Sequence, residues 1–289
     1  MAHVRRWRRA AWLACALLAP WTSGHAAADA STRRVIALAP HIVELVHAAG
    51  AQAQLAAVVD GSDFPQDARQ LPRLGDGTRL SIERVLGLRP DLVLAWQAAP
   101  VRSLLPWLER HGIDVEYVDP LTLDAVADAV DLMGIRLGTA EIARPRAAEF
   151  RRRIAVLRER HANDAPVRVF IQLGTSPMFS LGASSIVTDA LRACGGVNVM
   201  ADIALAAPQT SIEGALATQP DAILTGDPQA DIRTFWQRAG WPADGRADER
   251  IVALSADALY RPGPRLIDAT ERLCERLDAI RRLPQPAAL

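Results

Sequence analysis

The sequence predicts an α/β protein with two Rossmann-like lobes, each built on a parallel β-sheet, joined by a long backbone helix. Three observations support this. Short runs that are apolar throughout alternate with helical patterns over most of the chain, which is typical of parallel strands covered on both faces. A fourteen-residue pattern occurs once in each half of the chain. A helical stretch rich in arginine and glutamate separates the two halves.

Seven short runs are the expected strands. In chain order they read RVIAL, LAAVVD, DLVLAW and DVEYVD, followed by VRVFIQLG, DAILTG and IVALS. Helical patterns lie between them, and parallel strands need such crossover connections. The alternation therefore predicts one parallel sheet in each lobe.

The repeated pattern relates the two lobes. Residues 81–94 read SIERVLGLRPDLVL and residues 211–224 read SIEGALATQPDAIL, with seven of the fourteen positions identical. In both copies the serine is expected to cap a short helix, and Pro-Asp is expected to open a buried strand. HAAG ends at Gly50 before the first copy, and RACG ends at Gly195 before the second.

The segment between the lobes predicts a helix from Pro145 to Ala162, with the proline in the first turn. Its length would be about 27 Å at 1.5 Å per residue. One face carries, at three- and four-residue steps, Ala147, Phe150, Ile154, Leu157 and His161. The expected organisation is a signal peptide over 1–27, an N-terminal lobe over 28–137, a connecting helix over 138–164 and a C-terminal lobe over 165–289.

The N-terminus predicts export. A cationic stretch over residues 5–9 precedes an apolar run over 10–19 and small residues at 26–28, which is the pattern of a secretory signal peptide. The apolar run is shorter than the roughly 20 residues that a membrane span needs. Cleavage is expected between Ala26 and Ala28, and the expected location is the periplasm. Lipid attachment at Cys15 is the less favoured alternative.

Charge argues against a nucleic-acid partner. The chain has 33 basic and 33 acidic residues. Four arginines leave with the signal peptide, so the mature chain carries 29 − 33 = −4. Nucleic-acid binding favours long basic runs, and the mature chain has none longer than three residues. A monomer is expected.

The two cysteines of the mature chain are Cys194 and Cys274. An even pair in an exported protein favours a disulfide. Two buried free thiols are the alternative.

Candidate ligand contacts follow from the strand ends, because ligands of parallel sheets bind beyond the carboxyl ends of the strands. In the first lobe these positions include Pro40, His41, Asp60 and Trp96, and in the second lobe Phe179, Asp257 and Arg261. Trp96 and Phe179 either stack on a flat ligand or fill the core. Asp257 and Arg261 either bind polar ligand groups or form a local ion pair.

The repeated acids, Glu83 and Glu213, occupy the same place in the two copies. Each is suited to a first helical turn, where a carboxylate is favourable. Their symmetry also suits a partner with two basic sockets.

Motifs for catalysis are missing. The sequence has no G-x-S-x-G elbow, no glycine-rich phosphate loop and no H-E-x-x-H. His41, Glu44 and His47 are three residues apart, a spacing that turns the third away from the first on a helix, so no metal site is predicted. His111 and His161 are expected at the surface. An enzyme using Asp257 and Arg261 is the least favoured hypothesis, and no cofactor is expected.

Several motifs in order carry a family resemblance. They are VIALAP near the start, SDFP at 62–65, IERVLGLRPDLVLAW at 82–96, RVFIQLG at 168–174, CGG at 194–196, PQTSIE at 208–213, the segment 257–265, and LC at 273–274. Over about 34–281 the chain resembles the helical-backbone periplasmic binding proteins of ABC importers, and most closely their cobalamin-binding members.

The resemblance implies two lobes with a ligand held between them. Glu83 and Glu213 match the acids that dock on a membrane permease, and Cys194 and Cys274 match a disulfide. Positions at or near the corrinoid are matched by Trp96, Phe179, Asp257 and Arg261.

The chain departs from the family where cobalamin binders have further aromatic rings; Gly61, Gly77 and Ala207 stand there. The expected ligand is cobalamin or a related corrinoid. Haem or a ferric siderophore is the alternative, with Tyr260, Arg261 and His41 as its candidate contacts.

Overall fold

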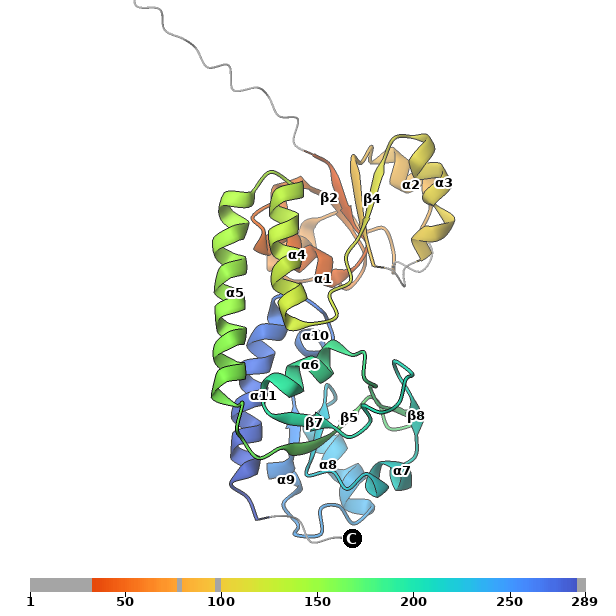
Figure 1. Ribbon diagram of the computed structural model, residues 1–289. Coiled ribbons are helices and arrows are strands. Elements are labelled where there is room, and N and C mark those ends of the chain that lie inside the picture. Colours follow the sequence, from red (N-terminus) through yellow and green to blue (C-terminus); the bar gives the residue numbers. More distant parts are fainter. Residues whose placement is uncertain (1–32, 77–79, 97–99, 285–289) are drawn as a thin grey trace, which may run out of the picture. The chain divides into compact units, whose positions relative to one another are not determined.

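A computed structural model describes residues 33–76, 80–96 and 100–284 (Figure 1). The predicted signal peptide, including Cys15, lies outside the described residues. Within those residues, no helix combines the length and the apolar character that a membrane crossing requires.

The first sheet contains four parallel strands in the order β2-β1-β3-β4. Their bounds are Val35–Ala37 (β1), Leu55–Val58 (β2), Leu92–Ala95 (β3) and Asp114–Tyr117 (β4). All four of the strands predicted for this half of the chain are present. The prediction of a parallel sheet is therefore confirmed here.

The second sheet is also parallel, in the order β10-β9-β5-β7. Its strands are Val167–Gln172 (β5), Gly196–Asn198 (β7), Ala222–Thr225 (β9) and Ile251–Ala253 (β10). The sequence analysis missed β7, which reads Gly-Val-Asn and therefore has no apolar run. A short antiparallel ribbon, Met178–Phe179 (β6) and Gln209–Thr210 (β8), stands apart from this sheet. Matched by chain order, the two main sheets have the same topology, which agrees with the sequence repeat.

Helices follow the strands in both halves. The first half contains α1 (Pro40–Ala48), α2 (Ile82–Gly87), α3 (Leu105–Arg110) and α4 (Leu123–Arg136), with 3-10 turns at Gln52–Gln54, Gln66–Gln70 and Pro100–Ser103. After α5 (Ala140–Arg160), the second half contains α6 (Ile186–Ala193), α7 (Ile212–Ala217), α8 (Gln229–Arg238), α9 (Ala247–Arg250), α10 (Ala256–Leu259) and α11 (Arg265–Arg281).

The inner strands β1, β3 and β9 are buried along their whole length, as is typical of parallel sheets covered on both faces. On β1 the side chains alternate: Val35 and Ala37 enter one hydrophobic cluster, and Ile36 enters another. The first of these clusters, here called the central core, also takes in α1, α4, α5, α6 and α11 and one face of the second sheet. Two outer cores cover the remaining faces, one with α2 and α3 and one with α7, α8 and α9.

The connecting helix α5 is longer than predicted. It begins at Ala140 instead of Pro145, so the proline lies inside the helix and not in its first turn, and that part of the prediction is wrong. Its 21 residues span about 31 Å. It packs along α4, where Gly134 is required because a Cβ there would lie 2.2 Å from the Cβ of Ala143 (Figure 1). The limits of the two lobes stay a prediction.

The structure confirms two local predictions. The hydroxyls of Ser81 and Ser211 cap α2 and α7 by accepting hydrogen bonds from the amides of Arg84 and Gly214. A disulfide joins Cys194 at the end of α6 to Cys274 in α11, across a Cα–Cα distance of 4.8 Å, and both cysteines are buried. The disulfide therefore links two helices of the central core.

Candidate functional site

Trp96 follows β3, and its side chain is 41% exposed. The indole Nε1 donates a hydrogen bond to Oδ1 of Asp119 at 2.8 Å. The ring of His41 packs against it in an edge-on arrangement, with centroids 5.7 Å apart. The alternative in which Trp96 fills the core is therefore wrong. A fixed indole with free surface is suited to stacking on a flat ligand, which remains a prediction.

His41 is in the first turn of α1, directly after Pro40, and is 3% exposed. Its Nε2 lies 3.4 Å from the carbonyl oxygen of Val118. Burial lowers the pKa of His41 from its ordinary value to about 4, because the charged imidazolium loses its hydration. The imidazole ring of His41 is therefore neutral at physiological pH, and it packs against Trp96 without placing a charge there.

Arg261 connects the two halves of the chain. Its Nη1 donates to the carbonyl oxygen of Gly61 at 3.1 Å and lies 3.7 Å from Asp63. Its Nη2 pairs with Oδ1 of Asp257 at 2.6 Å. The local ion pair expected as an alternative is thus present, and the same guanidinium also reaches the opposite lobe. These contacts orient the guanidinium but leave its role toward a ligand a prediction.

The guanidinium of Arg261 lies next to Gly61, which has no side chain. A Cβ on Gly61 would lie 3.7 Å from Nη2 of Arg261 and 3.7 Å from Cγ of Pro40. The glycine has a φ of +76°, a left-handed conformation that favours this residue. At the position where the resemblance leads one to expect an aromatic ring, the structure therefore places a planar cation next to a glycine.

The other predicted contacts lie in two further places. Phe179 is in β6, half-buried, and pairs with Gln209, while the exposed Ala207 lies just before β8. Asp60 is exposed, and its amide donates to the carbonyl oxygen of Gly75 at 2.7 Å. Gly77 lies outside the described residues. The structure thus brings together six of the predicted residues: Pro40, His41, Gly61, Trp96, Asp257 and Arg261.

Comparison with known proteins identifies the family. A family described as "Periplasmic binding protein" matches residues 35–243, most of the chain. The chain belongs to the periplasmic binding proteins. It is 35% identical over 246 residues to a protein named "Vitamin B12-binding protein" from Vibrio cholerae serotype O1, covering 84% of this chain and 88% of that one. A protein of the same name from Pectobacterium atrosepticum is 34% identical over 269 residues, covering 90% and 94%.

Solved structures agree with this assignment. The periplasmic vitamin B12-binding protein of Vibrio cholerae superposes with a TM-score of 0.78 at 35% identity, covering 87% of this chain and 98% of that one. A periplasmic haem-binding protein from Roseiflexus sp. RS-1 superposes with a TM-score of 0.74 at 27% identity, covering 86% and 99%. The two-lobed α/β fold predicted from the sequence is therefore confirmed for this periplasmic binding protein.

Glu83 and Glu213 are exposed first-turn residues of α2 and α7 in this periplasmic binding protein. The hydroxyl of Ser81 donates to Oε2 of Glu83 at 2.6 Å and lowers the pKa of that carboxyl. The pKa of the Glu213 carboxyl is lowered by its own backbone amide and then by Ser211. Both acids are therefore charged and solvent-facing, and the capping serine of each helix also favours the ionised form.

The triplet His41, Glu44 and His47 does not converge. The carboxylate of Glu44 binds Arg265, and Nδ1 of His47 lies 3.7 Å from Asp67. The three side chains therefore have separate partners.

Sequence reasoning missed the partners of two site residues. Asp119, which anchors Trp96, ends the DVEYVD run, so the strand-end rule would have found it. The pair between Glu44 and Arg265 has no local signal, because the two residues are 221 positions apart.

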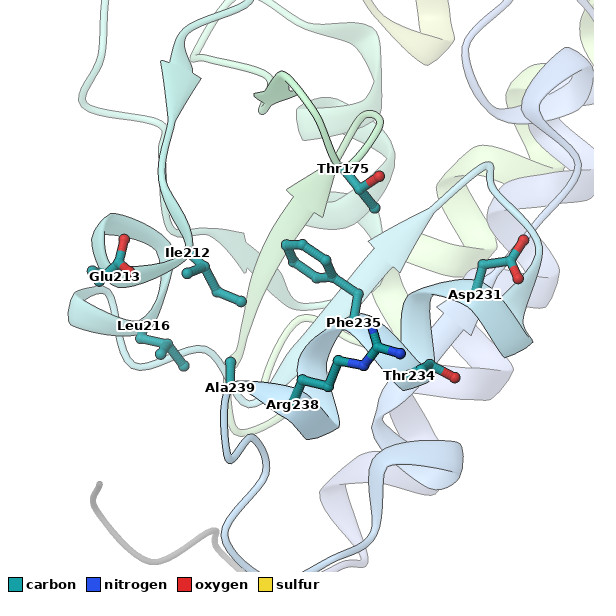
Figure 2. A pocket seen from close by; sticks show the side chains of 9 residues that line it. All are labelled: Thr175, Ile212, Glu213, Leu216, Asp231, Thr234, Phe235, Arg238 and Ala239. Carbon is teal, nitrogen blue, oxygen red and sulfur yellow. The ribbon is translucent and has the colours of Figure 1, made fainter.

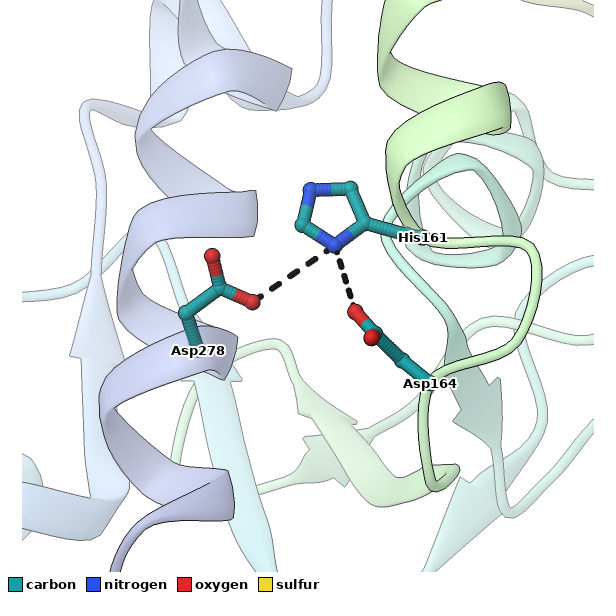
Figure 3. A group of neighbouring side chains, drawn as sticks. All are labelled: His161, Asp164 and Asp278. Atoms are coloured by element: carbon teal, nitrogen blue, oxygen red, sulfur yellow. Dashed lines mark hydrogen bonds and ion pairs between the residues drawn. The ribbon is translucent and has the colours of Figure 1, made fainter.

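His161 corrects a further prediction. His111 is exposed as expected, but His161 is only 4% exposed. Its Nδ1 lies 2.7 Å from Asp164 and 3.5 Å from Asp278 (Figure 3). Nη1 of Arg281 pairs with the same carboxylates at 3.2 and 2.7 Å. Since Arg281 pairs with both acids and Arg160 also pairs with Asp278, the carboxylates already have cationic partners. The cluster joins the end of α5 to α11 and is a poor cation site.

Proposed function

We propose that this chain is an exported periplasmic receptor that captures cobalamin or a related corrinoid and delivers it to the permease of an ABC importer. The observation that carries the proposal is the match, at 34–35% identity over most of both chains, to proteins named for vitamin B12 binding. The signal-like N-terminus supports export. In this role the protein binds and releases its ligand unchanged.

The geometry around Trp96 supports a large, flat ligand. The indole is held on its edge by Asp119 and against His41, so its conformation is restricted before a ligand arrives. A ring fixed in this way loses little conformational entropy on stacking. Arg261 and Asp257, which carry opposite charges, are placed to bind amide or carboxylate groups at the margin of such a ligand.

Haem is the second candidate, because a haem-binding protein shares the fold at 27% identity. The side chains here favour it less. The Tyr260 hydroxyl accepts from the amide of Gly226 at 2.9 Å and donates to the carbonyl oxygen of Gln172 at 3.3 Å. Burial raises the pKa of Tyr260, which opposes the phenolate that iron would take. His41 is buried against Trp96, so both residues expected to bind iron have structural partners.

Calorimetric titration of the mature chain with cyanocobalamin, and in parallel with haem, tests the proposal. We expect one-to-one binding of cyanocobalamin and weaker or no binding of haem. Tight haem binding without corrinoid binding would replace the proposed ligand. Binding of neither would remove both candidates.

A further inference from the structure

A groove of about 800 Å³ lies on the second half of the chain, between α7 and α8 (Figure 2). Ile212, Leu216 and Phe235 supply apolar surface, and Phe235 extends between the two helices. Glu213, the proposed docking acid, lies on its margin. The groove is therefore continuous with the surface that Glu213 would present to a permease.

The charged side chains around this groove are not neutralised by ion pairs within the described part of the chain. In the described part of the chain, Glu213, Asp231 and Arg238 make no ion pair, although all three line the groove. Arginines elsewhere are commonly paired, as Arg233 of α8 is with Asp248 of α9 at 3.0 Å. A groove with an apolar floor and unpaired charges of both signs suits a protein partner with complementary charges.

The first half of the chain repeats the spacing between the aromatic residue and the arginine. In α3, Trp107 precedes Arg110 by three residues, and in α8, Phe235 precedes Arg238 by three. Each arginine ends its helix and is followed by a residue and then glycine. Trp107 is 47% exposed, and the guanidinium of Arg110 lies 4.1 Å from its ring centroid. An exposed aromatic side chain stacked with an arginine is a combination enriched in interfaces.

The helices that carry these aromatic and arginine residues share a hydrophobic core with the helices that carry the docking acids. The outer core of the first half contains Val85 of α2 with Leu108 of α3. That of the second half contains Ala215 of α7 with Trp236 of α8. The helix with the acid and the helix with the aromatic–arginine pair thus share one core in each lobe.

We propose that in each lobe the acid and the aromatic–arginine pair form one docking surface for a permease, the sets being Glu83, Trp107 and Arg110, and Glu213, Phe235 and Arg238. This inference rests on the proposed function. Two like surfaces of the permease would each place a basic group against the glutamate and an acidic group against the arginine. In the second lobe an apolar permease side chain enters the groove beside Phe235.

Affinity of the ligand-loaded protein for the importer in nanodiscs tests this surface. The double variant Arg110→Glu with Arg238→Glu should bind the importer about tenfold more weakly or worse, because like charges then face each other. Ala239→Trp, which fills the groove without changing charge, should also weaken the complex. Arg272→Glu, an exposed residue of α11, is the matched control and should leave it unchanged. Ligand titration of each variant verifies the fold.

The outcomes separate this inference from the proposed function. If Glu83→Ala with Glu213→Ala abolishes the complex while the arginine and Ala239 variants bind normally, the acids dock and the wider surface is refuted. If none of these changes affects the complex, docking through the acids fails as well. Weakening by the arginine and groove variants, with intact ligand binding, supports the inference.

Discussion

Arg265 holds both carboxylate oxygens of Glu44, with Nε 3.0 Å from Oε2 and Nη2 2.6 Å from Oε1. Glu44 is in α1 and Arg265 begins α11, so the pair joins the two halves of the chain. The Glu44 side chain is 2% exposed. Burial raises the pKa of its carboxyl, and Arg265 opposes that rise. The guanidinium also lies 4.4 Å from the ring centroid of Phe64.

Removing Arg265 should therefore be costly. Arg265→Met leaves a buried carboxylate without its counterion, which typically costs about 3–5 kcal/mol of unfolding free energy. The measurement is urea denaturation at pH 7. The double variant Glu44→Gln with Arg265→Met should recover much of the loss, because neither charge is then buried alone. A loss below about 1 kcal/mol for the single variant would contradict this account.

Trp96→Ala should weaken cyanocobalamin binding by about tenfold or more, through lost stacking and lost buried area. Trp96→Phe keeps an aromatic face but cannot donate to Asp119, so its loss should be smaller. Asp119→Asn retains an acceptor and serves as the matched control for ring orientation. Calorimetric titration of the three variants provides the comparison. Equal affinity in Trp96→Ala and wild type would place the ligand elsewhere.

Glu83→Ala combined with Glu213→Ala should reduce ATP-driven uptake in proteoliposomes and leave ligand affinity intact. Both acids are exposed, and their contacts are with the capping serines of α2 and α7 and not with Trp96 or Arg261. The lowered pKa of both carboxyls means that they stay charged as the pH falls toward their ordinary values. Docking should thus persist at pH 5. Glu159→Ala with Glu275→Ala, two exposed acids on α5 and α11, is the control. A parallel loss of ligand affinity would argue against a docking role.

The features that could be predicted from the sequence are the strands and helix caps, because they have a periodic or repeated residue pattern. All seven expected strands are present because apolar runs flanked by helices have few other ways to be buried. The caps at Ser81 and Ser211 follow from local chemistry. The start of α5 was misplaced because tertiary packing against α4 extends the helix past Pro145, which suits a first turn but does not fix one.

Long-range polar contacts are harder to predict. Nothing near Arg261 in the chain indicates that it meets the carbonyl of Gly61, 200 residues away. His161 was expected at the surface, but it is buried, and its Nδ1 lies 3.5 Å from Asp278 of α11. Such contacts depend on how the two halves of the chain pack against each other, and the residue pattern along the sequence does not determine this packing.

Loss of the disulfide should destabilise the fold without disturbing the ligand site. Its cysteines are 80 residues apart, and a crosslink of that span contributes about 4 kcal/mol in the chain-entropy model. Cys194→Ala with Cys274→Ala should lower the urea midpoint accordingly and leave cyanocobalamin affinity unchanged. Thiol labelling of the unreduced, unfolded mature chain should find neither cysteine free. Two reactive thiols would show that the bridge does not form.

His41 should make stability depend on pH in the acid range. Its pKa is about 4 in the folded chain against 6.5 for the free side chain, and burial is the main cause. Between these values the unfolded chain binds a proton that the folded chain does not, so stability falls as the pH falls. The full difference is about 3 kcal/mol.

His41→Gln retains a donor toward the carbonyl of Val118 and does not titrate. Urea denaturation at pH 7 and pH 4.5 should show a loss in wild type that exceeds the loss in the variant by about 2–3 kcal/mol. Other groups titrate in both proteins and cancel in the comparison. Equal losses would mean that the imidazole is hydrated in the folded chain. The edge of Trp96 would then lie against a hydrated imidazole that becomes charged at low pH. Ligand stacking on Trp96 would itself depend on pH.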